Sequence, residues 1–403
     1  MKLLFDATEL SYYDENSTNR AGIFYVTLNL LNEFQKAGLD ITFHCDFKRY
    51  YILKKIKFFQ HIPLLKENSP INRLLSGILY LTDKLPAKIR YAFIVLARIY
   101  DKHFYITNKK NAGQLKKFDV YFSPCTPPTK EIANSKIPKF RIIHDTIPII
   151  EKNGQSHAGD WHDKVYNTIN DKDFYIANSE STRNDVLKYF PFVKAENIKT
   201  ALLGANENFR QTNDASPVNG KFVFSLCSLG KRKNLEFGIR NFFSFIEKNN
   251  IQDLKLVLGG SVWNKYKKEL NTILSRYDRE KVILAGYIDE TKLSKYYSNA
   301  LCFIYPSLYE GFGLPVLEAM QCGCPVITSN VSSLPEVIGD AGIQIDPNND
   351  TEMTDALEKM YFDSDFRRKC SQKGLKRAEH FSWEKCASEI ISFIEDKLNQ
   401  PVK

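Results

Sequence analysis

The sequence predicts an α/β protein with two Rossmann-like domains, each built on a parallel sheet. Ten short runs rich in β-branched and aromatic residues alternate with helical stretches, as expected for strands joined by crossover helices. A polar stretch containing Pro and Gly, residues 211–220, divides these runs into two groups of five. The 403 residues also exceed what one hydrophobic core usually fills.

These runs set the expected boundaries. We expect an N-terminal domain over residues 1–210, a linker over 211–220 and a C-terminal domain over 221–383. A last helix, within residues 384–403, has one apolar face that should be buried, and packing back on the N-terminal domain is one solution. The residues of that face are Ala387, Ile390, Ile391 and Ile394.

The positive charge is concentrated in one segment. The chain has 56 Lys and Arg against 47 Asp and Glu, for a net charge of +9. Residues 48–117 alone hold sixteen basic residues against three acidic ones, interleaved with aromatic and aliphatic residues. Two interpretations stay open: a solvated face of N-terminal helices, or a surface that contacts an anionic membrane. Nucleic acid is not expected as a partner, because no nucleic-acid motif accompanies the charge.

The apolar runs and the cysteines bear on location and on metal sites. No run approaches the roughly 20 apolar residues of a membrane span, and Asp6 and Glu9 interrupt the start where a signal peptide would be apolar. We expect a cytoplasmic protein, with peripheral attachment to the inner face of the cell membrane as an open alternative. Six of the eight cysteines stand singly and give no metal spacing, and for Cys322 and Cys324 core packing is favoured over a redox or metal pair.

The main candidate site lies in residues 305–329. A strand that ends near Tyr305 is followed by a loop with Glu310, Gly311 and Gly313. Pro315 then occupies a position suited to the first turn of a helix. The pattern therefore predicts a glycine-containing turn that opens a helix toward a ligand.

The start of this helix is suited to a phosphate group. Free amides of Leu314 and Val316 would point out of the helix N-terminus, where the positive end of the helix dipole favours anions. A nucleotide diphosphate lying there would have its sugar near Glu310 and its ribose near Glu318, because carboxylates accept hydroxyl hydrogen bonds. Otherwise Glu318 would only complement the helix dipole and Glu310 would be a surface acid.

The segment EGFGLPVLE, residues 310–318, closely resembles the E-x7-E signature of the large retaining glycosyltransferase family four. This family has the GT-B fold, in which two Rossmann-like domains face a central cleft. The resemblance implies that residues 1–210 form the acceptor domain and residues 221–383 the nucleotide-sugar-binding domain. Further segments resemble the family along nearly the whole chain, but residues from about 45 to 117 carry no recognisable family pattern and are interpreted as a basic, aromatic insertion. The other segments are AGIFYV, IHDTIP, IANSESTRNDV, LLGANENF, SLGKRKNL, GYIDETKLSKYYSNA and FSWEK.

The resemblance implies roles for the loop and for the basic run before it. Glu310 would hold hydroxyls of the donor sugar, and Glu318 would bind the ribose. Lys233, with Arg232 beside it, would bind the diphosphate, although Ser228 stands where many members have another Arg. The backbone amides that would line this donor pocket are those of Gly311, Phe312, Gly313, Leu314 and Val316.

In the N-terminal half, the resemblance points to three places. Gly22, whose amide lies at a predicted helix start, would approach the β-phosphate. His144 would contact the donor sugar near the reacting carbon, while Asp145 would position the acceptor or orient His144. Ser179 and Glu180 match a segment on the acceptor side. The catalytic candidates are His144, Asp145, Glu310 and Lys233.

The resemblance implies a retaining transfer of a hexose from a nucleotide sugar, with no metal or other cofactor required. GDP-mannose is the favoured donor and a UDP-hexose the second. The acceptor would be a growing surface polysaccharide, such as a lipopolysaccharide chain, or a lipid-linked oligosaccharide. Alternatives are a GT-B nucleotide-sugar epimerase and an inactive nucleotide-binding protein. An NAD-linked oxidoreductase is disfavoured, since the first strand lacks a GxGxxG turn.

Overall fold

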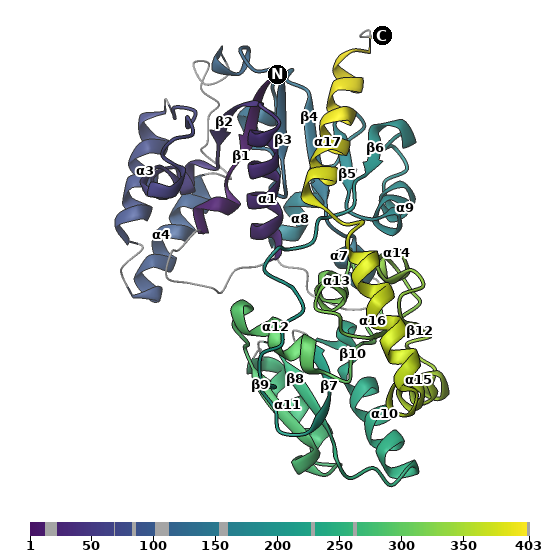
Figure 1. Ribbon diagram of the computed structural model, residues 1–403. Helices are drawn as coiled ribbons and strands as arrows, with labels where there is room; N and C mark the ends of the chain where they lie inside the picture. Colours follow the sequence, from purple (N-terminus) through teal and green to yellow (C-terminus); the bar gives the residue numbers. More distant parts are fainter. Residues whose placement is uncertain are drawn as a thin grey trace.

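The chain folds around two parallel six-stranded sheets, one in each half of the sequence (Figure 1). The structure is a computed structural model that describes residues 1–12, 22–67, 69–82, 86–100, 113–152, 160–226, 230–260 and 264–400. Below, the N-terminal unit means the elements around the first sheet and the C-terminal unit those around the second. The predicted α/β fold with two Rossmann-like sheets is confirmed.

The first sheet has the strand order β2-β1-β3-β4-β5-β6, and every pair of neighbours is parallel. Most of its strand residues are buried, because helices cover both faces as parallel sheets require. The carboxyl ends of all six strands lie at one edge, where ligands bind in folds of this kind. The strands are β1 (Lys2–Asp6), β2 (Asp40–His44), β3 (Val120–Ser123), β4 (Lys139–Ile143), β5 (Phe174–Ala177) and β6 (Ile198–Thr200).

Helices of the N-terminal unit connect these strands and, between β2 and β3, build an additional layer. This layer is the segment without a family pattern, and Figure 1 shows its helices α3 and α4 on the outer flank of the sheet. The helices are α1 (Gly22–Lys36), α2 (Tyr50–Lys55), α3 (Pro70–Thr82), α4 (Ala87–Ile99), α6 (Lys130–Ala133), α7 (Ile147–Lys152), α8 (Asp160–Asn167) and α9 (Glu180–Tyr189). Short 3-10 turns span Glu9–Tyr12, Phe47–Arg49, Lys57–Phe59 and Ala195–Asn197.

The second sheet has the order β12-β11-β10-β7-β8-β9 and is also parallel throughout. Its strands are β7 (Lys221–Leu226), β8 (Leu254–Gly259), β9 (Val282–Gly286), β10 (Cys302–Tyr305), β11 (Val326–Ser329) and β12 (Ile343–Ile345). Its helices are α10 (Leu235–Lys248), α11 (Asn264–Leu274), α12 (Glu290–Asn299), α13 (Leu314–Gln321), α14 (Leu334–Ile338), α15 (Asp350–Phe362) and α16 (Ser364–Ala378). Short 3-10 turns span Lys231–Lys233 and Arg279–Lys281.

All ten predicted strands are present, and the analysis of the sequence missed two. The missed strands, β6 and β12, are three residues long and lie at sheet edges. Runs of this length carry too little alternation to be distinguished from loops. The seven described cysteines are unpaired and buried, as the packing interpretation predicted, and Cys227 lies outside the described residues.

The last helix, α17 (Trp383–Leu398), runs beside α1 on the N-terminal unit (Figure 1). Its Phe393 ring packs edge-on against Phe140 and Phe174, with ring centroids 5.7 Å and 6.3 Å apart. At the other end of the helix, a Cβ added to Gly204 would lie 2.3 Å from the backbone nitrogen of Trp383. The chain therefore crosses back from the C-terminal unit and closes against the first sheet.

Removal of the Phe393 ring should destabilise the protein measurably. This side chain is only 8% exposed, so Phe393→Ala should lower the free energy of unfolding by about 3 kcal/mol through lost burial and a residual cavity. Phe362→Ala is the control, because that ring is 62% exposed, and its effect should stay within about 0.5 kcal/mol. Urea unfolding followed by circular dichroism measures both; equal midpoints would contradict the packing of α17.

Candidate functional site

Glu310 lies between two cations at the carboxyl end of the second sheet. Its Oε1 is 2.8 Å from Arg232 Nη1 and 2.6 Å from Lys233 Nζ, and it accepts a hydrogen bond from Tyr305 Oη at 3.0 Å. Burial favours the neutral acid, but the charges of Lys233 and Arg232 outweigh it and lower the pKa of Glu310. Glu310 is therefore a buried carboxylate that stays ionised at neutral pH.

Two serines fix the backbone of the loop that carries Glu310. Ser332 Oγ accepts a hydrogen bond from the Glu310 amide at 3.0 Å. Ser333 Oγ donates to the carbonyls of Glu310 and Phe312, at 2.9 Å and 2.7 Å. These serines were not predicted from the sequence, although they lie two and three residues after the predicted strand CPVITSN, where polar side chains at a parallel sheet edge are expected.

The loop with Arg232 and Lys233 is tied to the loop with Glu310 by its backbone. Arg232 Nη1 donates to the carbonyl of Tyr309, and the amide of Leu308 donates to the carbonyl of Arg232 at 2.8 Å. Lys233 Nζ also donates to Tyr305 Oη at 2.6 Å. Both cations are thus held at the position where the second sheet delivers Glu310.

The start of α13 matches the predicted turn, with one correction. Gly313 has a φ of +113°, and Pro315 lies in the first turn as predicted. The amide of Val316 is not free, however: it donates to the carbonyl of Gly313 at 3.0 Å, because the first turn of the helix closes with a tight bond. Among the described residues, the Leu314 amide has no such acceptor and remains available to a ligand.

Gly311 brings the two units into contact. A Cβ at this position would lie 2.1 Å from the carbonyl oxygen of His144, so no other residue fits without displacement. The carbonyl of Gly311 accepts hydrogen bonds from Ser179 Oγ at 2.7 Å and Thr182 Oγ1 at 3.2 Å. The β10–α13 loop is therefore docked onto the carboxyl edge of the first sheet.

His144 and Asp145 face this contact from the end of β4. His144 Nε2 lies 2.7 Å from the carbonyl oxygen of Pro124, which identifies Nε2 as the protonated nitrogen. Burial lowers the pKa of His144, so the neutral ring is favoured with Nδ1 as an acceptor. Burial raises the pKa of Asp145, and its Oδ1 accepts from the Ile147 amide at 2.9 Å.

A cavity of about 340 Å³ lies beside this centre, between the two units. Gly22 of α1 lines it opposite Leu314, and a Cβ on Gly22 would lie 3.6 Å from Leu314 Cδ1. Glu318 and Glu290 line the same cavity from α13 and α12. Burial raises the pKa of Glu318 to about 7, and nearby Glu290 adds to the rise although the hydroxyl of Tyr297 opposes it.

The structure brings most predicted residues together. Glu310, Arg232, Lys233 and Gly311 meet His144 and Asp145 where the two units touch, and the cavity with Gly22, Leu314 and Glu318 adjoins α13. Ser179 holds Gly311. Phe312 and Gly313 lie in the same loop as Gly311, and Val316 lies in the first turn of α13, with the side chains of Phe312 and Val316 buried. The Glu180 carboxylate pairs with Arg183 at 2.8 Å. Ser228 lies outside the described residues.

The described part of the chain shows neither a metal site nor a membrane-spanning helix. Among these residues, none of the groupings of His, Cys, Asp and Glu could hold a metal ion. None of the described helices is both long enough and apolar enough to cross a membrane.

The second half of the chain is similar to a family of known proteins. Residues 206–377 match the model of the glycosyl transferases group 1. The O-antigen chain mannosyltransferase B of Escherichia coli is 30% identical over 239 residues, which cover 57% of this chain and 62% of that protein. The chain thus spans less than two thirds of that relative's length.

Solved structures show the same fold over the whole chain. The sucrose-phosphate synthase of Thermosynechococcus elongatus aligns with a TM-score of 0.69 at 16% identity, covering 98% of this chain and 99% of that one. The Anabaena protein HepE, solved with UDP and glucose, aligns with a TM-score of 0.67 at 16% identity, covering 98% and 100%. The GT-B fold is therefore confirmed.

The raised pKa of Glu318 predicts a pH-dependent loss of stability. Because the folded state holds the proton up to about pH 7 while the ordinary value is 4.5, the proton's stabilising contribution is complete below pH 4.5 and is lost as the pH rises through 7. Glu318→Gln should therefore gain stability over the wild type between pH 5 and pH 8, on the order of 2 kcal/mol. Urea unfolding at both pH values measures the difference, with the exposed Glu196→Gln as a control. If the difference in unfolding free energy between Glu318→Gln and wild type were the same at both pH values, the raised pKa of Glu318 would be contradicted.

Proposed function

We propose that this chain, whose residues 206–377 match the model of the glycosyl transferases group 1, transfers a hexose from a nucleotide diphosphate sugar to a growing glycan. Mannose from GDP-mannose is the favoured donor, and the acceptor would be a surface polysaccharide or a lipid-linked oligosaccharide. One observation carries the proposal: the buried carboxylate Glu310 and the cations Arg232 and Lys233 meet His144 and Asp145 at the contact between the two units.

The diphosphate would bind to the cations that now pair with Glu310. A diphosphate carries more negative charge than one carboxylate and can accept charge-assisted hydrogen bonds from both Arg232 and Lys233. The Leu314 amide, at the positive end of α13, would add a neutral donor. These groups would also stabilise the charge that builds on the leaving diphosphate during the transfer.

Release of Glu310 from part of this ion pairing would free its carboxylate for the donor sugar. Each carboxylate oxygen can accept a sugar hydroxyl, and the serines that fix the loop keep the carboxylate in place. Neutral His144, held by Pro124, would face the sugar from the opposite unit near the reacting carbon. Asp145 would orient His144 or the acceptor hydroxyl.

We propose that the transfer retains the anomeric configuration by attack on the same face from which the diphosphate leaves. The bond between the anomeric carbon and the diphosphate oxygen breaks as the acceptor oxygen bonds to that carbon. The acceptor's proton passes to the leaving phosphate oxygen. This route needs no protein nucleophile, so it agrees with Glu310 being held as an ion-paired carboxylate.

The nucleoside would occupy the cavity of about 340 Å³, with its ribose hydroxyls on Glu318. Support for mannose comes from the relative named as a mannosyltransferase. A UDP-hexose is the second candidate, because HepE, which shares the fold, was solved with UDP and glucose. GDP-mannose and a UDP-hexose differ in their nucleobase, which is guanine in the first and uracil in the second.

A peripheral membrane contact through α3 and α4 forms part of the proposal. Ile71, Leu74 and Leu81 form an exposed apolar stripe on α3, and Ile89 and Leu96 form another on α4. The exposed cations nearby are Lys54, Lys55, Lys57, Arg73 and Lys88. Apolar side chains flanked by lysines suit the interface of an anionic bilayer, which would place the enzyme at the inner face of the cell membrane.

Nucleotide binding should be detectable by thermal shift. GDP at about 100 times its dissociation constant should stabilise the folded protein by about 2.7 kcal/mol, with UDP as the second candidate and ADP and NAD inactive. Lys233→Ala should weaken this binding about 10-fold or more, because a charge-assisted bond to phosphate is lost.

The matched control is Lys369→Ala, which removes an exposed lysine of α16 and should keep the shift of the wild type. Equal GDP shifts in wild type and Lys233→Ala would contradict the phosphate role of Lys233. A shift with NAD alone would contradict a glycosyl donor altogether.

Vesicle co-sedimentation tests the membrane contact. Leu74→Glu/Leu81→Glu places two charges on side chains that are 65% and 74% exposed, so the fold should persist while binding to vesicles with 30 mol% phosphatidylglycerol falls about 10-fold or more. Phe362→Glu, at a 62% exposed position of the C-terminal unit, should bind as the wild type does. If the double variant bound the vesicles as the wild type does, this face of α3 would be excluded as the membrane contact. If the wild type bound neutral and anionic vesicles equally, electrostatic attraction would not contribute to the binding.

A further inference from the structure

Helix α9 of the N-terminal unit is held at its N-terminus by a carboxylate of the C-terminal unit (Figure 1). The first amides of a helix have no acceptor within the helix, so they require one from outside it. Glu336 of α14 accepts from the amide of Glu180 through Oε2 and from the amide of Ser181 through Oε1, both at 2.7 Å. The Glu180 carboxylate does not fill this role, because it accepts from Arg183 Nη1 at 2.8 Å. The acceptor therefore comes from the other unit.

The same helix has a second contact with the C-terminal unit, through the hydroxyl of Tyr309. This hydroxyl donates to Asp185 Oδ2 in the middle of α9 and lies 3.3 Å from Thr146 Oγ1. Burial and the hydrogen bond to Asp185 raise the pKa of Tyr309, so the phenol stays protonated and remains a donor at neutral pH. Two side chains from separate segments of the C-terminal unit thus reach one helix of the N-terminal unit.

Both residues are also tied to the loop that carries Glu310. Tyr309 directly precedes Glu310, and the Tyr309 carbonyl accepts from Arg232 Nη1. Helix α14 begins directly after Ser333, whose hydroxyl donates to the carbonyl of Glu310 at 2.9 Å. Movement of α9 relative to either contact would therefore be passed on to Glu310.

Helix α14 is itself anchored in the C-terminal unit, so Glu336 is a fixed point. Arg377 of α16 donates to the carbonyl of Glu336 at 2.6 Å through Nη2 and to that of Val337 at 3.2 Å through Nε. The side chains of Leu334, Val337 and Ile338 are fully buried. A fixed acceptor that holds two successive amides constrains the orientation of α9 as well as its distance.

On the other side of the contact, α9 lies next to the residues at the end of β4. Thr182 Oγ1 of α9 is 3.2 Å from the carbonyl oxygen of Gly311 and 3.5 Å from that of His144. Thr146, which the Tyr309 hydroxyl reaches, directly follows Asp145. The position of α9 is therefore coupled both to the loop of the C-terminal unit and to the end of β4.

We infer that Tyr309 and Glu336 are positioning residues that act together as one clasp on α9. By holding this helix against the C-terminal unit, they set the position of Glu310 relative to His144 and Asp145. The inference rests on the proposed transferase function and deepens it, because it assigns the alignment of the two halves of the site to named residues. Neither Tyr309 nor Glu336 lines the cavity of about 340 Å³ in which we place the nucleoside.

Amide hydrogen exchange, read residue by residue on the full chain without any ligand, tests whether the two contacts act as one clasp. The amides of Glu180 and Ser181 lose their acceptor and exchange when the clasp opens. Tyr309→Phe leaves Glu336 intact and removes one hydroxyl, yet exchange at both amides should be about 10-fold faster, because a hydrogen bond to a carboxylate is lost. Glu336→Gln should accelerate this exchange by a similar factor or more.

Tyr361→Phe is the matched control for Tyr309→Phe. The Tyr361 hydroxyl also donates to an aspartate, Asp253 at 2.8 Å, but both of these residues belong to the C-terminal unit. Tyr361→Phe should therefore leave exchange at the two α9 amides unchanged. In both clasp variants, the Thr351 amide, which Asn349 caps inside the C-terminal unit, should exchange as in the wild type.

The ring of His144 reports the positioning itself. Nuclear magnetic resonance of isotope-labelled histidine measures the pKa of this ring, which burial lowers in the closed protein. Opening of the clasp admits water to the ring, so the pKa of His144 should rise toward its ordinary value in Glu336→Gln. The same pKa should stay as in the wild type in Tyr361→Phe.

Equal exchange at the two α9 amides in Tyr309→Phe and wild type would overturn the clasp, and an unchanged pKa of His144 in Glu336→Gln would overturn its positioning role. The GDP thermal shift of the same samples separates this inference from the donor site, and both clasp variants should keep the shift. Absence of a GDP shift even in the wild type would reject the proposed donor site. The exchange and the titration need no ligand, so they still decide whether the clasp exists.

Discussion

The ion pairing of buried Glu310 with Arg232 and Lys233 is the interaction on which the site depends. A carboxylate that is 7% exposed would be costly without a partner, and each cation in turn would be left uncompensated if Glu310 were neutral. The pairing joins the segment after β7 to the loop after β10, which are 77 residues apart in sequence but adjacent in the sheet. It holds in place the two cations that we propose bind the diphosphate.

The contact between the two units depends on the absence of a side chain at Gly311. The loop approaches so closely that its carbonyl is held by Ser179 and Thr182, while His144 lies against its Cα. The proposed transfer requires water to be excluded from the donor, and this contact would cover the reacting centre from the side of the N-terminal unit. The same packing at Gly311 therefore sets the position of His144 and brings the two units into contact. A change in how the units pack would move His144 relative to Glu310.

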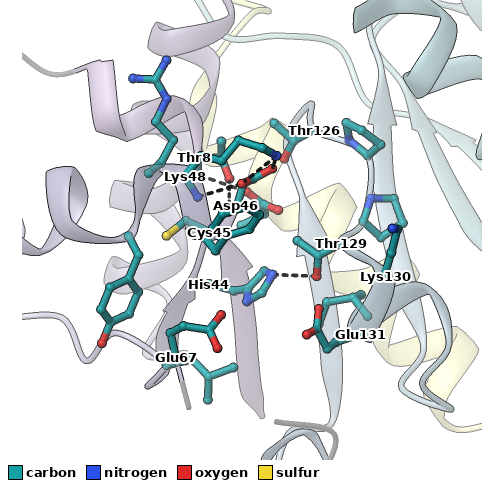
Figure 2. A pocket seen from close by; sticks show the side chains of 18 of the residues that line it. Thr8, His44, Cys45, Asp46, Lys48, Glu67, Thr126, Thr129, Lys130 and Glu131 are labelled. Carbon is teal, nitrogen blue, oxygen red and sulfur yellow. Dashed lines mark hydrogen bonds and ion pairs between the residues drawn. The ribbon is translucent and has the colours of Figure 1, made fainter. Parts of the chain in front are cut away.

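The sequence predicted what is encoded locally. The turn with Gly313 and Pro315 depends on backbone conformation, so its residues were recognisable, and the parallel sheets followed from alternating strands and helices. The pairing of Glu310 with Lys233 and the support by Ser333 depend on sheet order, which spacing does not reveal. The Val316 amide was wrongly predicted to be free because the tight first turn of α13 is a detail of geometry. The cavity of about 600 Å³ at the carboxyl edge of the first sheet (Figure 2) was missed because many of its lining residues come from a segment without a motif.

The segment without a family pattern contributes both to the interior and to an exposed apolar surface. Leu79 of α3 is buried and lines the cavity of about 600 Å³ at the carboxyl edge of the first sheet, while Leu74 and Leu81 of the same helix are exposed. One helix therefore presents one face to the interior and another to the surface for which we propose a membrane contact. Exposed apolar side chains are poorly solvated by water, and the interface of a bilayer would relieve that cost, which is the physical reason for the proposal.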